Sequence, residues 1–295
     1  MVTSRPGGTF GAAGLVLVGL ICQDIGAAIA VTLFPAVGAL GMVSLRLAFS
    51  ALVLMAVFRP SLRGRTRSDW ATVVAFGLVL AAMNVLFYEA ISRIPLGTTV
   101  TIEVLGPLIL SVVTSRRASA WLWAALAFAG VLILGQGGWG ELDPLGVGFA
   151  VAAGTAWVGY ILLSARTGAS FSRLDGLAIA MTIGAVVTVP FGAVTAGPSL
   201  IQLPILAIGL VVALLSSAVP YALELLALRR LPAATFSILM SLSPALAATA
   251  GLIILHQALT AWDALAIALV VIASMGAVRA AARRDAQLPP PEVSP

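Results

Sequence analysis

Two stretches of thirteen residues, PLGTTVTIEVLGP at 95–107 and PAATFSILMSLSP at 232–244, both begin and end with proline. Three positions of the first stretch recur in the second at an offset of 137 residues. The matching pairs are Pro95 and Pro232, Thr98 and Thr235, and Pro107 and Pro244. A repeat at a fixed offset indicates that the two halves of the chain share one architecture.

The repeat continues beyond the prolines. The pattern Trp-x-Ala-Leu-Ala begins at Trp123 and again at Trp262, two residues further apart than the proline pairs. If each copy holds five membrane crossings, an odd number, the second copy must enter the membrane upside down relative to the first. Inverted repeats are the plan of many secondary transporters, which bind their substrate near the midplane between the copies.

The composition places the chain in a membrane. Of its 295 residues, 61% are hydrophobic and 9% are charged, whereas a soluble globular domain has about 25% charged residues. An ordinary soluble enzyme is therefore excluded. Apolar windows of about 20 residues are long enough to cross a bilayer as helices. We predict ten spans, at 12–34, 38–58, 71–92, 96–115, 119–138, 145–165, 175–195, 204–228, 233–255 and 262–281.

These spans define the predicted fold class, an all-α integral membrane protein of ten transmembrane helices in two inverted five-helix repeats. The first repeat covers residues 1–142 and the second covers residues 143–282. Residues 283–295 are polar and rich in proline. We expect them to form a disordered cytoplasmic tail.

The arginines follow the alternation of the connections between spans. Of the sixteen, fourteen fall on the side of the N-terminus, whereas the opposite connections hold Arg93 with Glu141, Asp143 and Asp263. By the positive-inside rule, both termini are predicted to be cytoplasmic. This topology accounts for the net charge of +5 without a nucleic-acid partner, because the arginines form no basic face.

Several functional classes lack the residues that they need. The chain has no lysine, so it has no GxxxxGK phosphate loop and no Schiff-base lysine. Cys22 is the only cysteine and His256 the only histidine. These residues predict no metal site, no cofactor and no catalytic residues, and therefore no enzyme.

The few charged residues within the predicted spans are the first candidates for a transport site, because a charge at a helix centre is costly. Asp24 lies halfway along the first span and is the best candidate for a proton or cation site. Arg46 and Glu103 lie at matching depth, about 10–12 Å below the outer boundary at roughly 1.5 Å per residue. They are expected to pair, either to line the site or to join two helices.

Other candidates are polar or aromatic. Glu224 lies near two arginines at the cytoplasmic end of the eighth span. It can form an ion pair with them at the rim of the bundle or contact the substrate, and the sequence leaves both roles open. Amphipathic side chains prefer a membrane interface or a polar cavity. The candidates of this kind are Asn84, Tyr88, Trp157, Tyr160 and Tyr221. Glu89 and Arg93 form an i, i+4 pair that is predicted to be a solvated rim contact.

Four stretches, which together span most of the chain, resemble the ten-helix EamA-type transporters of the drug/metabolite transporter superfamily. They are LFPAVGALGMVSLRLAF at 33–49, MNVLFYEAISRIPLGTTVTIEVLGPL at 83–108, AWVGYILLSARTGA at 156–169 and SSAVPYALELLALRRLPAATFSILMSLSPALAA at 216–248. The resemblance implies export of a solute from the cytoplasm through a central cavity built from both repeats. It also implies a location in a bacterial inner membrane.

The chain departs from the family pattern at several positions. Ser243 stands where the amino-acid exporters of this family carry glutamate, and His256-Gln257 stand where a Gly-Glu pair is common. Val31 occupies the place of a frequent lysine, and Asp24 is a charge that the pattern does not contain. The charges of the transport pathway are therefore arranged differently in this chain.

The polar residues predict a small zwitterionic substrate such as threonine or homoserine. Carboxylates suit its ammonium group, Arg46 suits its carboxylate, and the amide and phenols suit hydroxyl groups. Coupling to protons through Asp24 is expected, with facilitated diffusion as the alternative. Two other functions stay open on the same fold: export of cationic drugs and translocation of lipid-linked metabolites.

Overall fold

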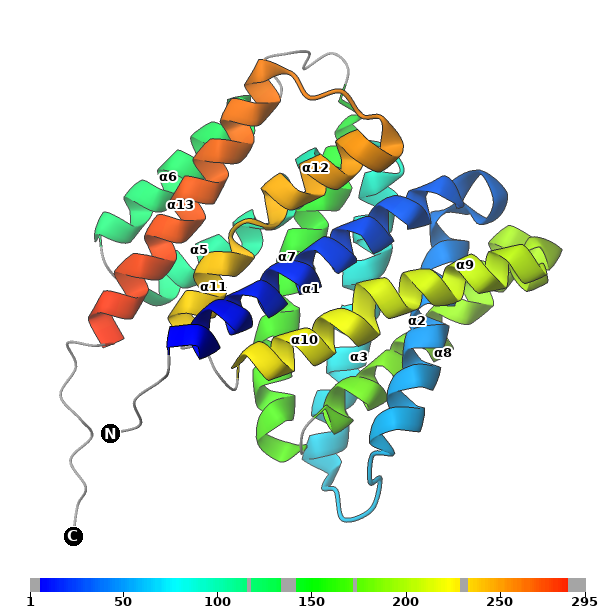
Figure 1. The fold of residues 1–295 in the computed structure, drawn as a ribbon. Coiled ribbons are helices and arrows are strands. Elements are labelled where there is room, and N and C mark those ends of the chain that lie inside the picture. Colours follow the sequence, from blue (N-terminus) through cyan, green and yellow to red (C-terminus); the bar gives the residue numbers. More distant parts are fainter. Residues whose placement is uncertain (1–5, 116–117, 134–141, 172–173, 229–232, 286–295) are drawn as a thin grey trace, which may run out of the picture.

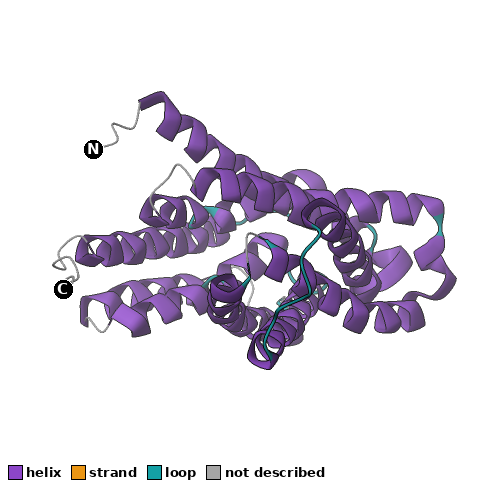
Figure 2. Ribbon diagram, turned by 90° about the horizontal axis from the view of Figure 1, so that it is seen from below, coloured by secondary structure: helices purple, strands orange, loops and turns teal. Residues whose placement is uncertain are grey.

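The computed structural model describes residues 6–115, 118–133, 142–171, 174–228 and 233–285, and the secondary structure within these ranges is entirely helical (Figures 1 and 2). The first half contains α1 (Pro6–Thr32), α2 (Phe34–Phe58), α3 (Arg67–Ile91), α4 (Leu96–Glu103), α5 (Leu105–Ser115) and α6 (Ala118–Ile133). The second half contains α7 (Pro144–Ser170), α8 (Asp175–Ala196), η1 (Gly197–Ile201), α9 (Leu203–Ala213), η2 (Leu214–Ala218), α10 (Val219–Leu228), α11 (Ala233–Met240), α12 (Ser243–Leu255) and α13 (Ala261–Asp285).

The helices are those of a multi-pass membrane protein. Within the described ranges, nine stretches are long and apolar enough to cross a membrane. The predicted span at 119–138 is the exception, because residues 134–141 lie outside the described ranges. Its described part, α6, has 16 residues and is therefore about 24 Å long, which is less than the hydrocarbon thickness of about 30 Å.

Large apolar side chains point outward around the bundle. Val194 is 85% exposed, Leu203 is 80% exposed and Ile201 is 76% exposed. Alanine dominates many of the buried contacts, as at Ala28 and Ala30 of α1, which are both inaccessible. This distribution fits a lipid environment, where small residues allow helices to approach one another and large apolar residues face the acyl chains.

The bundle consists mainly of paired helices from the two halves of the chain. α2 packs along α8, α3 packs along α7, and α6 packs along α13, while α1 lies against α10 and α12. Figure 1 shows that α1 begins and α13 ends at the same end of the bundle. Each long helix of the first half is therefore held by a helix that begins more than 50 residues after it ends.

Two predicted spans are interrupted at equivalent positions. α4 and α5 meet at Val104, and α11 and α12 are separated by Ser241 and Leu242. α4 and α11 both have eight residues, and α11 begins 137 residues after α4, the same offset that relates the prolines. The sequence predicted continuous spans at 96–115 and 233–255, so it missed both interruptions.

Proline accounts for the interruptions. Pro107 and Pro244 have no N–H group and cannot donate to the carbonyls four residues earlier, those of Glu103 and Met240. α4 ends at Glu103, and α11 ends at Met240. Each half-helix thus ends at the residue whose carbonyl loses its helical donor.

A third proline changes the predicted span at 204–228. Pro220 cannot donate to the carbonyl of Ser216, and the chain adopts a π-helix over η2 between α9 and α10. The guanidinium of Arg46 reaches this point from α2, and its Nη2 donates to the Ser216 carbonyl at 3.1 Å. Arg46 therefore replaces the hydrogen bond that Pro220 cannot supply.

The junction of α4 and α5 packs closely against α7. A Cβ atom added to Gly154 of α7 would lie 2.6 Å from the carbonyl oxygen of Glu103, closer than real Cβ atoms approach. A Cβ atom added to Gly106 would lie still closer to the backbone oxygen of Gly154. Only glycine at these positions allows the end of α4 to lie on α7.

We predict that Gly154→Ala destabilises the protein, because its Cβ overlaps a backbone oxygen that cannot move independently. Overpacking of this kind costs about 1–3 kcal/mol, so the midpoint of thermal unfolding in detergent should fall by several degrees.

Gly148→Ala is the matched control on the same helix, since nothing lies within 4 Å of its added Cβ. It should leave the midpoint unchanged or raise it slightly. Equal midpoints for the Gly154 variant and the wild-type protein would contradict the proposed close contact.

Candidate functional site

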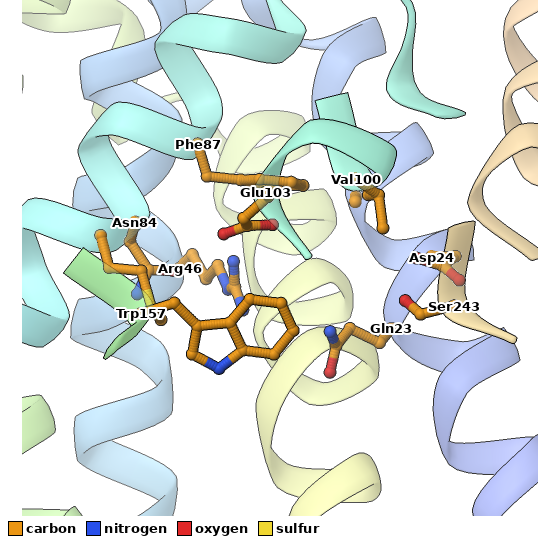
Figure 3. Close-up of a pocket in the computed structure, with 11 residues that line it drawn as sticks. Gln23, Asp24, Arg46, Asn84, Phe87, Val100, Glu103, Trp157 and Ser243 are labelled. Carbon is orange, nitrogen blue, oxygen red and sulfur yellow. The ribbon is translucent and has the colours of Figure 1, made fainter. Parts of the chain in front are cut away.

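A cavity of about 70 Å³ lies within the bundle and contains most of its buried charge. We call it the polar cavity. Its lining comes from α1, α2, α3, α4, α7 and α12, and Figure 3 shows the polar side chains converging on it. The lining residues are Gln23, Asp24, Ala27, Arg46, Met83, Asn84, Phe87, Val100, Glu103, Trp157 and Ser243.

The helix interruptions lie at the wall of this cavity. Glu103 is the last residue of α4, and Ser243 is the first residue of α12. Both line the cavity. Interrupted transmembrane helices place helix ends and their unsatisfied backbone groups beside a site, which is how many transporters bind charged solutes at membrane depth.

Asp24 is the most isolated charged group of the cavity. Its side chain is 4% exposed, and its Oδ2 atom has no hydrogen-bond partner among the described residues. Figure 3 shows it next to Ser243, across the cavity from Asn84. An unpaired buried carboxylate costs several kcal/mol, so this oxygen is suited to a cation, a proton or the ammonium group of a solute.

Arg46 is held by two other helices. Its Nη1 donates to the Tyr88 hydroxyl at 3.4 Å, its Nη2 donates to the Ser216 carbonyl at 3.1 Å, and the guanidinium lies 5.5 Å from the centre of the Tyr88 ring. The Nε atom has no hydrogen-bond partner in the described part of the chain. Arg46 thus braces α2 against α3 and η2 and also presents a positive charge to the cavity.

The direct ion pair between Arg46 and Glu103 that we expected from their matching depth is not present. Among the described residues, the ion pairs within 4 Å join Arg93 to Glu89 and to Asp143. Depth along a helix does not fix the direction of a side chain, and the free carbonyl of Ser216 takes one end of the guanidinium. The expected rim contact between Glu89 and Arg93 is confirmed, at 3.7 Å.

The remaining polar groups leave acceptors for a ligand. Glu103 is 8% exposed and faces the same space as Arg46. The Asn84 amide nitrogen donates to the Leu80 carbonyl of its own helix at 2.8 Å, which leaves its amide oxygen free to accept. Two carboxyl groups and one guanidinium therefore surround a space that admits only a small solute.

The structure brings together some of the predicted site residues and separates others. The predicted residues that line the cavity are Asp24, Arg46, Asn84, Glu103 and Trp157.

Tyr88 lies behind Arg46. Tyr160 packs its ring 5.2 Å from that of Phe76, and Tyr221 packs against the main core. Neither of these two tyrosines lines the polar cavity. The side chain of Glu224 lies outside what the structure describes.

Two polar residues of the cavity were not among the predicted site residues. Gln23 and Ser243 both line it. The signals were present in the sequence, because Gln23 precedes Asp24 within an apolar span and Ser243 precedes a proline that interrupts a helix. Neutral polar side chains are common in transmembrane helices, so neither residue stood out by charge.

The His256-Gln257 departure lies at the other end of α12. The side-chain oxygen of Gln257 accepts a hydrogen bond from the Leu96 backbone N–H at 3.0 Å. His256 ends the helix in the left-handed conformation, with φ of 54°, and is exposed. The His256-Gln257 departure therefore changes contacts at the N-terminal end of α4, whereas the Ser243 departure changes the lining of the polar cavity.

Curated proteins similar to this chain are transporters. The chain is 41% identical over 277 residues to the threonine/homoserine exporter RhtA of Salmonella typhimurium strain LT2, covering 93% of each protein. It is 41% identical over 265 residues to the threonine/homoserine exporter RhtA of Escherichia coli strain K12, covering 89% of each. The sequence profile of the EamA-like transporter family matches residues 144–279.

A protein of known crystal structure has the same fold. It superposes with a TM-score of 0.62 over 93% of this chain and 99% of its own length, at 17% sequence identity. At that identity the likeness extends to the arrangement of the helices alone.

Proposed function

Because this chain belongs to the EamA-like transporter family, we propose that it is a secondary transporter that exports threonine, homoserine or similar small polar amino acids from the cytoplasm. On the structural side, the proposal rests on one observation. Buried groups of both charges line one small cavity between two interrupted helices. The two exporters named above are relatives at 41% identity over most of their length.

A zwitterion is the ligand that this cavity suits best. The carboxylate of an amino acid can be placed at Arg46 and its ammonium group at Glu103, so that each solute charge meets an opposite charge as it leaves water. Asn84 supplies an acceptor for a side-chain hydroxyl. The volume of about 70 Å³ lies well below the roughly 300–1,000 Å³ of pockets for drug-sized ligands, which favours a small solute over a lipophilic drug.

The proposed architecture is ten transmembrane helices in two inverted repeats, 1–142 and 143–282. The equal length and spacing of α4 and α11 support it. The helix contacts support it as well. α2 packs with its counterpart α8, and α6 packs with its counterpart α13. Exchanging the two halves converts the contact of α1 with α10 into that of α7 with α3.

The proposed orientation places both termini in the cytoplasm of a bacterial cell, with residues 283–295 as a disordered tail and the bundle in the inner membrane. The arginine alternation supports this orientation. α1 begins and α13 ends at one end of the bundle, as an even number of crossings requires (Figure 1).

The function is tested by overexpression in a bacterial host that is challenged separately with threonine, homoserine, other amino acids and cationic dyes, with efflux of each solute measured. We expect faster efflux of threonine or homoserine and no resistance to dyes. Dye resistance without amino-acid efflux would instead indicate a drug exporter. Accumulation of a lipid-linked precursor on the outer leaflet, with neither effect, would indicate a lipid-linked metabolite translocase.

Arg46 and Glu103 are each predicted to be needed for transport. Arg46→Gln and Glu103→Gln remove one charge that offsets a solute charge, so threonine uptake into inside-out vesicles should fall at least about tenfold, which corresponds to about 1.4 kcal/mol.

Arg93→Gln is the control, since Arg93 pairs with Glu89 and Asp143 and lines no part of the polar cavity. It should transport at close to the wild-type rate. Unchanged transport in both cavity variants would remove Arg46 and Glu103 from the site.

We propose that Asp24 couples transport to protons. The cavity holds two carboxyl groups and one guanidinium, and a bound zwitterion adds no net charge. One carboxyl group therefore remains uncompensated in the membrane, where an unpaired charge costs about 2.5–3.5 kcal/mol. A proton from outside balances it at the unpartnered Oδ2 of Asp24 while the site is empty of solute, and on the cytoplasmic side the ammonium group of the solute replaces that proton.

Asp24→Asn is predicted to abolish proton movement coupled to threonine. In proteoliposomes that contain a pH-sensitive dye, the proton flux per threonine transported should fall toward zero. The double variant Asp24→Asn/Ser243→Glu should restore part of it, because position 243 returns a carboxyl group to the same cavity. A proton flux at the wild-type ratio in Asp24→Asn alone would remove Asp24 from the mechanism.

A further inference from the structure

A second, larger cavity lies on the other side of the helix interruptions. Its volume is about 400 Å³, within the range of ligand sites. We call it the serine cavity. Its lining residues are Val104, Pro107, Leu108, Ser111, Trp157, Ile161, Phe236, Ser237, Met240, Ser241, Ser274, Ala277 and Val278.

The two cavities use opposite halves of the interrupted spans. The polar cavity is lined by α4 and α12, whereas the serine cavity is lined by α5 and α11, by α7 and by the second half of α13. α13 ends at the end of the bundle where α1 begins (Figure 1). In the proposed orientation, the serine cavity therefore lies on the cytoplasmic side of the polar cavity.

The chemistry of the serine cavity differs from that of the polar cavity. Its lining contains four serines and no formally charged side chain. Ser274 is 6% exposed, and its Oγ has no hydrogen-bond partner among the described residues. Hydroxyl groups in an otherwise apolar wall can bind a small hydroxylated solute and its water, but nothing there offsets a full charge. Such a space binds weakly and releases readily.

Trp157 is the residue that both linings share. It lies on α7 one turn after Gly154, where α7 contacts the end of α4. Figure 3 shows its indole ring among the polar side chains of the polar cavity. Its bulky ring therefore borders both the charged space and the uncharged one.

We propose that the serine cavity is a vestibule that receives a small hydroxylated amino acid from the cytoplasm, and that the indole of Trp157 is the partition between the vestibule and the polar cavity. This proposal rests on the proposed export function and adds a second binding site to it. The solute first occupies an uncharged, weakly binding site and then passes Trp157 to reach the opposite charges of the polar cavity. Weak binding before the partition allows fast loading at cytoplasmic concentrations.

The test uses single cysteine reporters in a Cys22→Ala background. Ser111→Cys reports on the serine cavity and Ala27→Cys on the polar cavity, and both are labelled in inside-out vesicles with a cationic, membrane-impermeant thiosulfonate. We expect Ser111→Cys to react quickly and threonine to slow its reaction. Ala27→Cys should react slowly, and the addition of Trp157→Ala should accelerate it at least about tenfold.

Trp121→Ala is the matched control, since Trp121 is 58% exposed on α6 and lines neither cavity. It should leave the Ala27→Cys rate unchanged. Trp157→Phe keeps a smaller ring and should give an intermediate Ala27→Cys rate. This variant tests the partition even if Trp157→Ala misfolds.

An unreactive Ser111→Cys overturns the vestibule, and an Ala27→Cys rate that does not respond to Trp157→Ala overturns the partition. Absence of protection by threonine in a protein that exports threonine overturns the vestibule as a binding site. Absence of export in the wild-type protein would instead refute the proposed function, because the reporter rates do not depend on transport.

Discussion

Three prolines withhold backbone N–H groups in the middle of the membrane, and much of the site follows from how the protein compensates for them. In lipid, each backbone polar group must find a partner within the protein. Pro107, Pro220 and Pro244 leave the carbonyls of Glu103, Ser216 and Met240 without their helical donors. Arg46 supplies a donor to the Ser216 carbonyl, whereas Gly154 only leaves room for the Glu103 carbonyl at the surface of α7.

The same compensation positions the charged groups. Arg46 donates to the Tyr88 hydroxyl and the Ser216 carbonyl and also lines the cavity, so its charge is shared between the scaffold and the cavity. Glu103 ends α4 because Pro107 ends the helical hydrogen bonding there. Asp24, in contrast, has no such support, and its Oδ2 has no hydrogen-bond partner in the part of the chain that the structure describes. Because Asp24 has the smallest structural role of the three charged groups, a proton or a solute can bind it without breaking a contact that holds the helices together.

The sequence revealed the class of fold and the charged part of the site for clear physical reasons. Composition and apolar windows identify a membrane bundle because lipid tolerates so few charges, and this is also why Asp24, Arg46 and Glu103 stood out. Gln23 and Ser243 carry no charge and gave no such signal. The helix interruptions were missed because a 20-residue hydropathy window averages over a break of one or two residues.

Side-chain direction is where sequence reasoning failed most clearly. Tyr160 and Tyr221 have the same amphipathic character as Tyr88, yet Tyr88 reaches Arg46 while the other two pack elsewhere. The matching depth of Arg46 and Glu103 was a property of the helices, whereas pairing depends on rotamers and on competing partners. The competing partner, the Ser216 carbonyl, is accessible only because Pro220 lies four residues later.

The positions of the fixed contacts indicate which helices can move during transport. α3 and α7 are joined at one end by the ion pair of Arg93 with Asp143 at 3.3 Å. At the other end, Arg65, which precedes α3, lies 4.5 Å from the ring centre of Phe171, which follows α7. A pair fixed at both ends moves as one body. Near the interruptions, Pro107 and Pro244 cannot donate a helical hydrogen bond, and helices bend most readily where such a bond is missing. A polar cavity of about 70 Å³ must widen to pass a solute, and we expect the half-helices α4, α5, α11 and α12 to provide this widening by moving against the α3–α7 pair.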